Sequence, residues 1–385
     1  MDPSLSGRVA LAGIGETAIG ALPGRTYLQL QAEAVLAALE DAGLRREDVD
    51  AVFTNLPIRN PTSMSAEHLI EYLHLPARVA STMDAHGAGA VLQIQHAAAM
   101  IAAGLCRVAV CVVARNDRIW RGRPRRSSLL MGTEDEADLY GAGSPPVQYA
   151  LAARRHMHEY GTTSRQFGAV AVAMRRHAAL NPNAQMRETM TLDDHQSSPW
   201  VVDPFRLLDC CQVSDAAGAV VVVSAERARD LRRRPVLLRG MAEAHTHRSA
   251  AQAPGLTTLG SADAAERVYA MAGLTPGDVD FAEIYDCFTY AVIVQLEDYG
   301  FCPKGEGGGF VEGGRIERGG ELPVNTHGGL LSQGHADGMF HVTEAVRQLR
   351  EAAGKRQVSG AGVALVTGVG GAPFGAFGSL ILTKD

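Results

Sequence analysis

The stretch Ala42-Gly43-Leu44-Arg45-Arg46-Glu47-Asp48-Val49-Asp50 returns later in the chain as Ala272-Gly273-Leu274-Thr275-Pro276-Gly277-Asp278-Val279-Asp280. Each copy follows a segment in which apolar residues recur at helical spacing. A second pair occurs in the same order, because Ala102-Ala103-Gly104 and Ala352-Ala353-Gly354 each precede an apolar run. A repeat period of over 200 residues is too long for a solenoid. It indicates two homologous half-domains in one chain.

The first half alternates between strand and helix patterns. Short apolar runs at 9–13, 51–54 and 107–113 predict buried strands. Between them, apolar residues at helical spacing predict a helix at 28–42 that ends at a glycine. A second helix is expected at 85–103, where few polar positions occur, so this helix should be buried on most sides. The alternation predicts an α/β protein with stacked layers.

The second half repeats this alternation and sets the expected domain organisation. Further strands are expected at 217–223, 281–285, 363–367 and 378–383. We therefore expect an N-terminal half at 1–224 and a C-terminal half at 225–385. The pattern loosens at 115–200, which is rich in Arg, Pro, Gly and Ser. We expect this region to be an inserted loop region or lid on the first half.

Composition excludes several classes of function. Of the 385 residues, 46% are hydrophobic and 20% charged, and the net charge of −6 disfavours generic nucleic-acid binding. No apolar run approaches the ~20 residues that a membrane-spanning helix needs. The six cysteines form no CxxC pair, which disfavours a disulfide scaffold or a zinc ribbon in this chain. With no visible signal peptide, these features favour a reduced, cytoplasmic protein and indicate no metal site.

Three motifs carry a resemblance to a known family. They are Glu283-Ile284-Tyr285-Asp286-Cys287-Phe288, Asn325-Thr326-His327-Gly328-Gly329 followed by Gly334-His335, and Pro204-Phe205-Arg206-Leu207-Leu208-Asp209-Cys210-Cys211 followed by Ser214-Asp215. Together with the duplication they resemble the thiolase superfamily, in its sterol-carrier-protein-x and lipid-transfer-protein branch. The resemblance covers essentially the whole chain. It implies a thiolase-like α/β fold of two duplicated α-β-α-β-α half-domains with an inserted loop domain.

The departures from the thiolase pattern bear on the chemistry. A thiolase carries a nucleophilic cysteine at the start of the buried helix, where this chain has His86. The second thiolase cysteine is replaced by Gly368, and the asparagine of the Glu-x-Asn motif is replaced by Tyr285. This combination resembles the lipid-transfer-protein aldolases of steroid side-chain degradation, which cleave a β-hydroxyacyl-CoA without a covalent acyl intermediate. One difference remains, because His335 stands where those aldolases have a second tyrosine.

The resemblance and the chemistry of a retro-aldol step suggest roles for the remaining polar residues. The step needs a base for the β-hydroxyl and hydrogen-bond donors for the enolate. We expect Tyr285 to be the base, His335 the enolate-side donor or proton relay, and Asp286 the residue that orients a histidine. A tyrosine titrates near ~10 and needs help from a neighbour, which His335 or His327 would supply. Backbone amides of Gly370 and Gly371 are expected in the oxyanion hole.

Several of these residues also have a purely structural interpretation. His86 could cap or pack a helix start, and Tyr285, Asp286, His327 and His335 could serve the core, a loop or a turn. Residues 115–126 hold six arginines and Trp120. This segment is either a solvated loop or the place where CoA phosphates bind, since arginine suits phosphate and a tryptophan can stack on adenine.

Three functions follow from the sequence. The leading one is a lyase acting on a β-hydroxyacyl-CoA, with the CoA thioester as substrate and no bound cofactor. The alternatives are a thiolase-like acyltransferase or Claisen enzyme with another nucleophile such as His86, and a non-catalytic subunit that binds acyl-CoA. The resemblance further implies a homodimer and a small OB-fold, zinc-ribbon partner protein.

Overall fold

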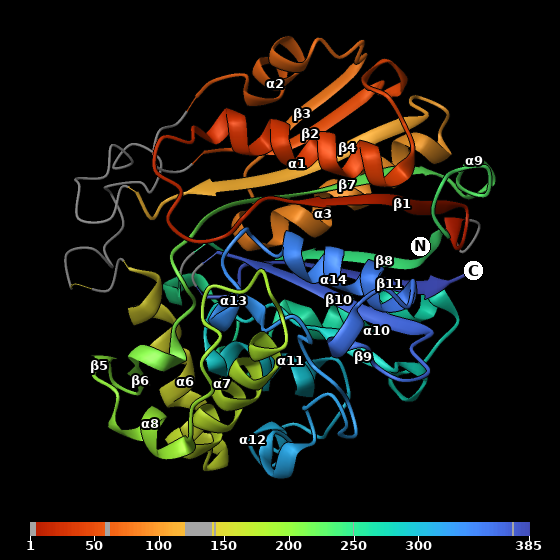
Figure 1. Ribbon diagram of the computed structural model, residues 1–385. Coiled ribbons are helices and arrows are strands. Elements are labelled where there is room, and N and C mark those ends of the chain that lie inside the picture. The colour runs from red at the N-terminus through yellow and green to blue at the C-terminus, as the bar shows by residue number, and fades with distance from the viewer. Residues whose placement is uncertain (1–4, 58–61, 120–140, 142–143, 249, 372) are drawn as a thin grey trace.

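The fold is built on one mixed sheet of nine strands. The computed structural model describes residues 5–57, 62–119, 141, 144–248, 250–371 and 373–385 (Figure 1). The first half contributes β1 (Val9–Glu16), β2 (Ala51–Asn55), β3 (Val79–Met83), β4 (Val108–Asn116) and β7 (Asp215–Ser224). Their order across the sheet is β3-β2-β4-β7-β1. β2 pairs in parallel with both β3 and β4, whereas β7 is antiparallel to β4 and β1.

The second half repeats this strand order. It contributes β8 (Val236–His245), β9 (Phe281–Glu283), β10 (Val363–Gly370) and β11 (Ala376–Lys384), in the order β8-β11-β10-β9. Val324 forms an isolated parallel bridge to Ala282 on the outer side of β9, at the place that β3 takes beside β2. The two halves join where β1 pairs antiparallel with β8. The duplication expected from the sequence is confirmed by this repeated order.

The repeated sequence stretch forms the same local structure twice. In the first copy α1 (Tyr27–Ala42) ends at Gly43, and in the second α10 (Gly260–Ala272) ends at Gly273. Both glycines take a left-handed conformation, with φ of 74° and 68°, which closes the last helical turn. A short 3-10 turn then leads into β2 or β9. The repeat therefore encodes one helix–turn–strand unit used twice.

Helices cover and separate the two halves of the sheet (Figure 1). α1 and α2 (Ser65–Leu73) pack on the outer face of the first half. α3 (Gly89–Ala102) and α14 (Met339–Leu349) fill the layer between the halves. α10 and α11 (Thr289–Asp298) cover the second half. The strands β3 and β8 were not expected from the sequence, because their residues mix polar and apolar side chains without a clear apolar run.

The insertion in the first half packs against the second half. Its elements are α6 (Pro145–Tyr160), α7 (Ser164–Ala179), α8 (Leu192–Ser197), β5 (Trp200–Val202) and β6 (Phe205–Arg206). In sequence it interrupts the first half, but α7 contacts α11, α12 (Gly307–Phe310) and α13 (Gly329–Ser332). The short helix α9 (Ala225–Ala228) follows β7. Within the described residues, none of the helices combines the length and apolar character that crossing a membrane requires.

Candidate active site

The fold brings Tyr285 and His335 together, although they are 50 residues apart in the chain. Tyr285 lies between β9 and α11, where its backbone N–H donates to Oγ1 of Thr367 at 2.9 Å. Its carbonyl oxygen accepts a hydrogen bond from Nε2 of Gln295 at 2.9 Å. The hydroxyl of Tyr285 then lies 3.3 Å from Nε2 of His335. The backbone N–H and carbonyl groups of Tyr285 are thus held by β10 (Val363–Gly370) and α11 (Thr289–Asp298), which fixes the direction of its side chain.

The Tyr285 side chain reaches the turn that precedes α3. A Cβ atom added at Gly87 would lie 2.0 Å from the Tyr285 hydroxyl oxygen and 2.3 Å from the carbonyl oxygen of Val369. Only a residue without a side chain leaves room for the phenol there. Tyr285 is 4% exposed, and this burial raises the pKa of its phenol well above the usual value. The side chain of Tyr285 is therefore the neutral phenol.

His335 links the buried phenol to the surface. Its backbone N–H donates to Oγ of Ser214 at 3.0 Å, and its side chain is 20% exposed. Nε2 also lies 3.7 Å from Oδ1 of Asp337. Burial lowers the pKa of His335, and the carboxylate of Asp337 opposes that shift. The imidazole is thus neutral near pH 7 and able to exchange a proton with Tyr285.

Asp337 is a site residue that the sequence analysis did not identify. It is 2% exposed and forms an ion pair with Arg115 from the end of β4. Its other carboxylate oxygen accepts a hydrogen bond from Nδ2 of Asn55, at the end of β2, at 3.3 Å. Burial raises the pKa of Asp337, but Arg115 and His335 outweigh this effect and the net shift is downward. The motif Gly334-His335-Ala336-Asp337-Gly338 was the signal available in the sequence.

Arg115 is not available for phosphate binding. Its side chain is 5% exposed, and its guanidinium also lies 3.6 Å from a carboxylate oxygen of Asp117. Burial opposes its charge, but the two carboxylates raise the pKa of Arg115 overall. Arg118 donates to the carbonyl oxygen of Val213 at 3.3 Å. The rest of the arginine-rich segment, from residue 120, lies outside the described residues, so its proposed contact with CoA stays a prediction.

Neither thiolase thiol position offers a replacement thiol. His86 occupies the first position with φ of +45°, its side chain is 43% exposed, and it lies 3.9 Å from Asp84. No described contact joins it to Tyr285 or His335. At the second position, a Cβ atom on Gly368 would lie 2.9 Å from the carbonyl oxygen of Gly87. The backbone before α3 therefore packs too closely against β10 to admit a side chain at residue 368 without a shift.

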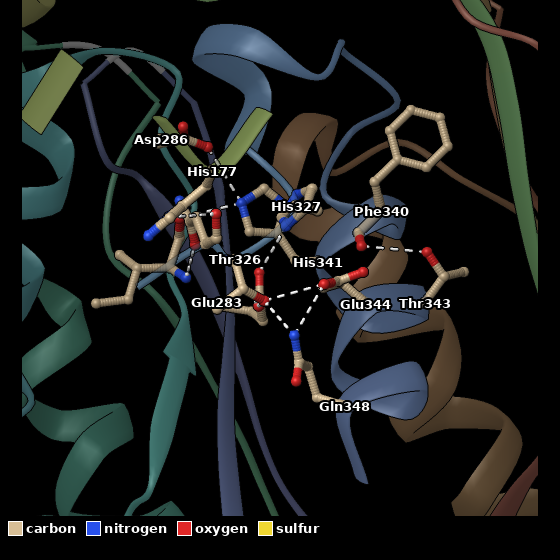
Figure 2. A network of polar contacts seen from close by, with 12 residues as sticks. His177, Glu283, Asp286, Thr326, His327, Phe340, His341, Thr343, Glu344 and Gln348 are labelled. Atoms are coloured by element: carbon tan, nitrogen blue, oxygen red, sulfur yellow. Dashed lines mark hydrogen bonds and ion pairs between the residues drawn. The ribbon is translucent and has the colours of Figure 1, made fainter. Parts of the chain in front are cut away.

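Asp286 contacts a histidine, as expected, but this histidine is His341 and not His335 (Figure 2). Its carboxylate lies 3.1 Å from Nε2 of His341. It also accepts hydrogen bonds from the backbone N–H groups of Leu330 at 2.7 Å and Leu331 at 3.2 Å, at the start of α13. Asp286 is fully buried and its described partners do not include His335. This geometry fits a carboxylate that holds the 329–332 turn and the His341 ring behind Tyr285.

His327 lies in a buried polar network behind the site (Figure 2). Nδ1 lies 2.8 Å from Oε2 of Glu283, at an angle unsuited to a hydrogen bond, and both side chains are fully buried. Burial lowers the pKa of His327 to about 4, so it is neutral near pH 7. Burial and the neighbouring Glu344 raise the pKa of Glu283 well above its usual value. His327 thus belongs with the buried acids, and no described contact links it to Tyr285.

The glycine turn after β10 lies beside the turn that leads into α3. A Cβ atom on Gly370 would lie 2.1 Å from the carbonyl oxygen of Ala85, and Gly371 has φ of +80°. The carbonyl oxygen of Gly371 accepts a hydrogen bond from the hydroxyl of Tyr149 at 3.2 Å. The turn is therefore fixed near Tyr285, while the use of its amides as an oxyanion hole stays a prediction.

The six cysteines stand at positions other than those of the two thiolase thiols. Two of them, Cys287 and Cys211, lie close enough to Tyr285 to help raise the pKa of its phenol. All six are within the described residues and all are free thiols. Burial raises the pKa of Cys211 and Cys302 to about 12 and that of Cys106 to about 11. Among the described residues, no group of three or more His, Cys, Asp and Glu side chains is arranged to hold a metal ion.

Comparisons with known proteins match this architecture over the whole chain. The family model described as "Thiolase, N-terminal domain" matches residues 9–226, and "Thiolase C-terminal domain-like" matches residues 242–384. A protein of Mycobacterium tuberculosis named 17-hydroxy-3-oxo-4-pregnene-20-carboxyl-CoA lyase is 41% identical over 96% of this chain and 98% of that protein. A steroid side-chain-cleaving aldolase of Thermomonospora curvata is 40% identical over 90% of this chain and 91% of that protein.

Solved structures agree with these matches. A chain of a structure named "Ltp2-ChsH2(DUF35) aldolase" superposes with a TM-score of 0.89 at 39% identity, covering 99% of both chains. Human mitochondrial 3-ketoacyl-CoA thiolase in complex with CoA superposes with a TM-score of 0.73 at 17% identity, over 99% of this chain and 98% of that one. The second likeness shows the shared fold alone, and the thiolase-like fold expected from the sequence is confirmed.

Proposed function

This chain belongs to the thiolase family, and from that membership we propose that it is a carbon–carbon lyase that cleaves a β-hydroxyacyl-CoA by a retro-aldol reaction. The relatives at 40% and 41% identity are named as an aldolase and a lyase, which supports this reaction class. The observation that carries the proposal is the pairing of Tyr285 with His335 in a site that lacks both thiolase thiols. Covalent acyl transfer through cysteine has no nucleophile there.

The proposed reaction uses Tyr285 and His335 as a coupled pair. Since Tyr285 rests as a phenol, its proton first passes to Nε2 of His335, which leaves a phenolate. The phenolate takes the proton of the β-hydroxyl as the carbon–carbon bond breaks and a carbonyl product forms. The bonding electron pair becomes the enolate of the shorter acyl-CoA. His335 then returns a proton to the enolate carbon, so both side chains regain their resting state.

Other residues near the pair would bind or support rather than react. Backbone amides of Gly370 and Gly371 are proposed to stabilise the enolate oxygen, since their turn is held beside the start of α3. Asp286 and His327 are proposed to support the wall behind Tyr285, because each is buried and contacts other polar groups of the network. His86 is exposed, so its proposed contribution is contact with the substrate.

The acyl group is proposed to be a steroid side chain. The names of the two relatives describe steroid substrates, and the 17-hydroxy thioester of the first has a hydroxyl on the carbon next to the α-carbon. Retro-aldol cleavage of such a thioester would release a steroid ketone and a shorter acyl-CoA. The CoA thioester supplies the acidity at the α-carbon, and the reaction consumes no free CoA.

The test compares a steroid 17-hydroxy-20-carboxyl-CoA with a straight-chain 3-oxoacyl-CoA, each with and without free CoA, and identifies products by mass. Cleavage of the hydroxy thioester without free CoA supports the lyase. Tyr285→Phe should lower kcat by about 10²–10⁴-fold, the usual contribution of a general acid–base group. The matched control is Tyr290→Phe, a buried tyrosine whose hydroxyl donates to the carbonyl oxygen of Leu256 at 3.0 Å. Full activity of Tyr285→Phe would refute the assignment.

Cleavage of the oxo thioester only in the presence of free CoA would instead indicate a thiolase-like acyltransferase. In that case His86, at the position of the thiolase nucleophile, would be the residue to replace first. If neither thioester is turned over, even with a candidate partner protein, the non-catalytic acyl-CoA-binding function would gain support.

We also propose a homodimer that works with a small OB-fold, zinc-ribbon partner in the cytoplasm. β3 is the last strand of the sheet on the side of the first half and carries neither charge nor proline, which supports pairing of this edge with a second copy. The solved relative named with ChsH2(DUF35) suggests a partner of the DUF35 class. Light scattering at micromolar concentration should give a dimer mass, and a monomer mass would contradict the dimer.

A further inference from the structure

We infer that Asp337, anchored by Arg115 from the other half of the chain, is a positioning residue that orients His335 toward Tyr285 and stabilises its protonated form during turnover. This inference rests on the proposed function for its kinetic consequence. The influence of Asp337 on the pKa of His335 does not depend on the identity of the substrate.

The Tyr285 hydroxyl and the Asp337 carboxylate lie near the same nitrogen of the His335 imidazole. Nε2 of His335 lies 3.3 Å from the Tyr285 hydroxyl and 3.7 Å from Oδ1 of Asp337. A proton that leaves Tyr285 for Nε2 therefore arrives beside a carboxylate. Positive charge on the imidazole is stabilised there, because an opposite charge within ~4–6 Å favours the charged form.

Asp337 is held by two contacts that fix its direction. Arg115 forms an ion pair with Oδ1, and Nδ2 of Asn55 donates to Oδ2 at 3.3 Å. Asn55 is itself fixed, since its Nδ2 donates to the carbonyl oxygen of Ala114 and its Oδ1 accepts from the backbone N–H of Ala114, both at 3.1 Å. Strands β2 and β4 of the first half thus hold a carboxylate on a loop of the second half. The carboxylate cannot turn away from His335 without breaking these contacts.

The charge balance needs no further reactant. Proton transfer converts a neutral phenol and a neutral imidazole into a phenolate and an imidazolium, while Asp337 and Arg115 keep their charges. Charged and titratable groups that act on His335 are Asp337 from its own loop, Arg115 and Asp117 from the end of β4, Tyr285 after β9, and Asp286 beside Tyr285. Among them, Asp337 is the carboxylate with a described contact to the ring.

The test removes the negative charge of Asp337 with substitutions that keep its backbone conformation. Asp337 has φ of +42°, a left-handed conformation that asparagine and glycine tolerate, so Asp337→Asn is the first variant and Asp337→Gly the second. The matched control is Asp209→Asn, because Asp209 is a buried carboxylate 2.8 Å from Nε2 of the buried His195. Histidine-labelled protein is titrated by NMR, and the His335 signal is identified by its loss in His335→Gln.

The NMR midpoint of His335 should move to lower pH by about one unit or more in Asp337→Asn and stay unchanged in Asp209→Asn. On the hydroxyacyl-CoA substrate, kcat should fall by about 10–100-fold with KM unchanged, and the acid limb of the pH–rate profile should shift in the same direction. An unchanged His335 midpoint in Asp337→Asn and Asp337→Gly would overturn the inference. A wild-type protein that fails to cleave the substrate would refute the proposed function, and the NMR result would still decide the role of Asp337.

Discussion

Replacement of Gly87 by alanine tests whether the position of the Tyr285 hydroxyl is essential. The added Cβ would lie 2.0 Å from the hydroxyl oxygen and 2.1 Å from Cζ, whereas ordinary contacts begin at 3.4 Å. The phenol, or the turn at Gly87, must therefore shift by roughly 1.4 Å, the gap between those two distances. The turn itself cannot move freely, because the new Cβ would also meet the carbonyl oxygen of Val369 at 2.3 Å.

The surroundings of Tyr285 limit how this clash is relieved. Its backbone is held by Thr367 and Gln295, and its ring stacks on the ring of His341 at an interplanar angle of 27°, with centroids 6.1 Å apart. Displacement of a reacting group by about 1 Å costs on the order of 10²-fold in rate. Overpacking of a buried site costs about 1–3 kcal/mol of stability. We expect Gly87→Ala to lose at least 10²-fold in kcat with a moderate fall in the free energy of unfolding.

The assay is product formation from the hydroxyacyl-CoA, with urea unfolding of the same preparations. Gly309→Ala is the matched control, since Gly309 lies in α12, where an added Cβ meets no atom within 4 Å. The control should retain wild-type kcat. If Gly87→Ala were as active as wild type while remaining folded, the Tyr285 hydroxyl would not need its present place, and the assignment of Tyr285 as the reacting group would be wrong.

Two further predictions concern pH and thiol chemistry. Burial lowers the pKa of His177 to about 4 from 6.5, so the folded state keeps the ring neutral. The stability from this neutral ring is fully present above pH 6.5 and is lost as pH falls toward 4. Between pH 7 and pH 5 wild type should therefore lose about 2 kcal/mol more than His177→Gln in urea unfolding, and equal losses would contradict this. Iodoacetamide at neutral pH should leave lyase activity intact, because burial raises the pKa of Cys211 and Cys302 to about 12 and also raises the pKa of Cys287, which keeps these thiols protonated. Inactivation that substrate prevents would argue for a catalytic thiol.

The local structure of the repeat was readable from the sequence. A helix that ends at a glycine and is followed by a turn and an apolar run is encoded by residues close together in the chain, so both copies were recognised from 42–50 and 272–280. Strands β3 and β8 were missed because their residues mix polar and apolar side chains and so form no clear apolar run. The packing of the insertion against the second half was also missed, since contacts between distant segments leave no local pattern.

For the site, the sequence by itself determined which chemical groups are present and which are absent. The motif around Tyr285, the His335 element and the loss of both thiolase cysteines were sufficient to indicate aldol chemistry. Only the tertiary structure decided how these groups are paired. In the folded chain Asp286 contacts His341, and His327 lies among buried acids. Arg115 is buried and forms an ion pair with Asp337. These pairings depend on burial and on contacts between the two halves of the chain, and both arise only when the central layers close.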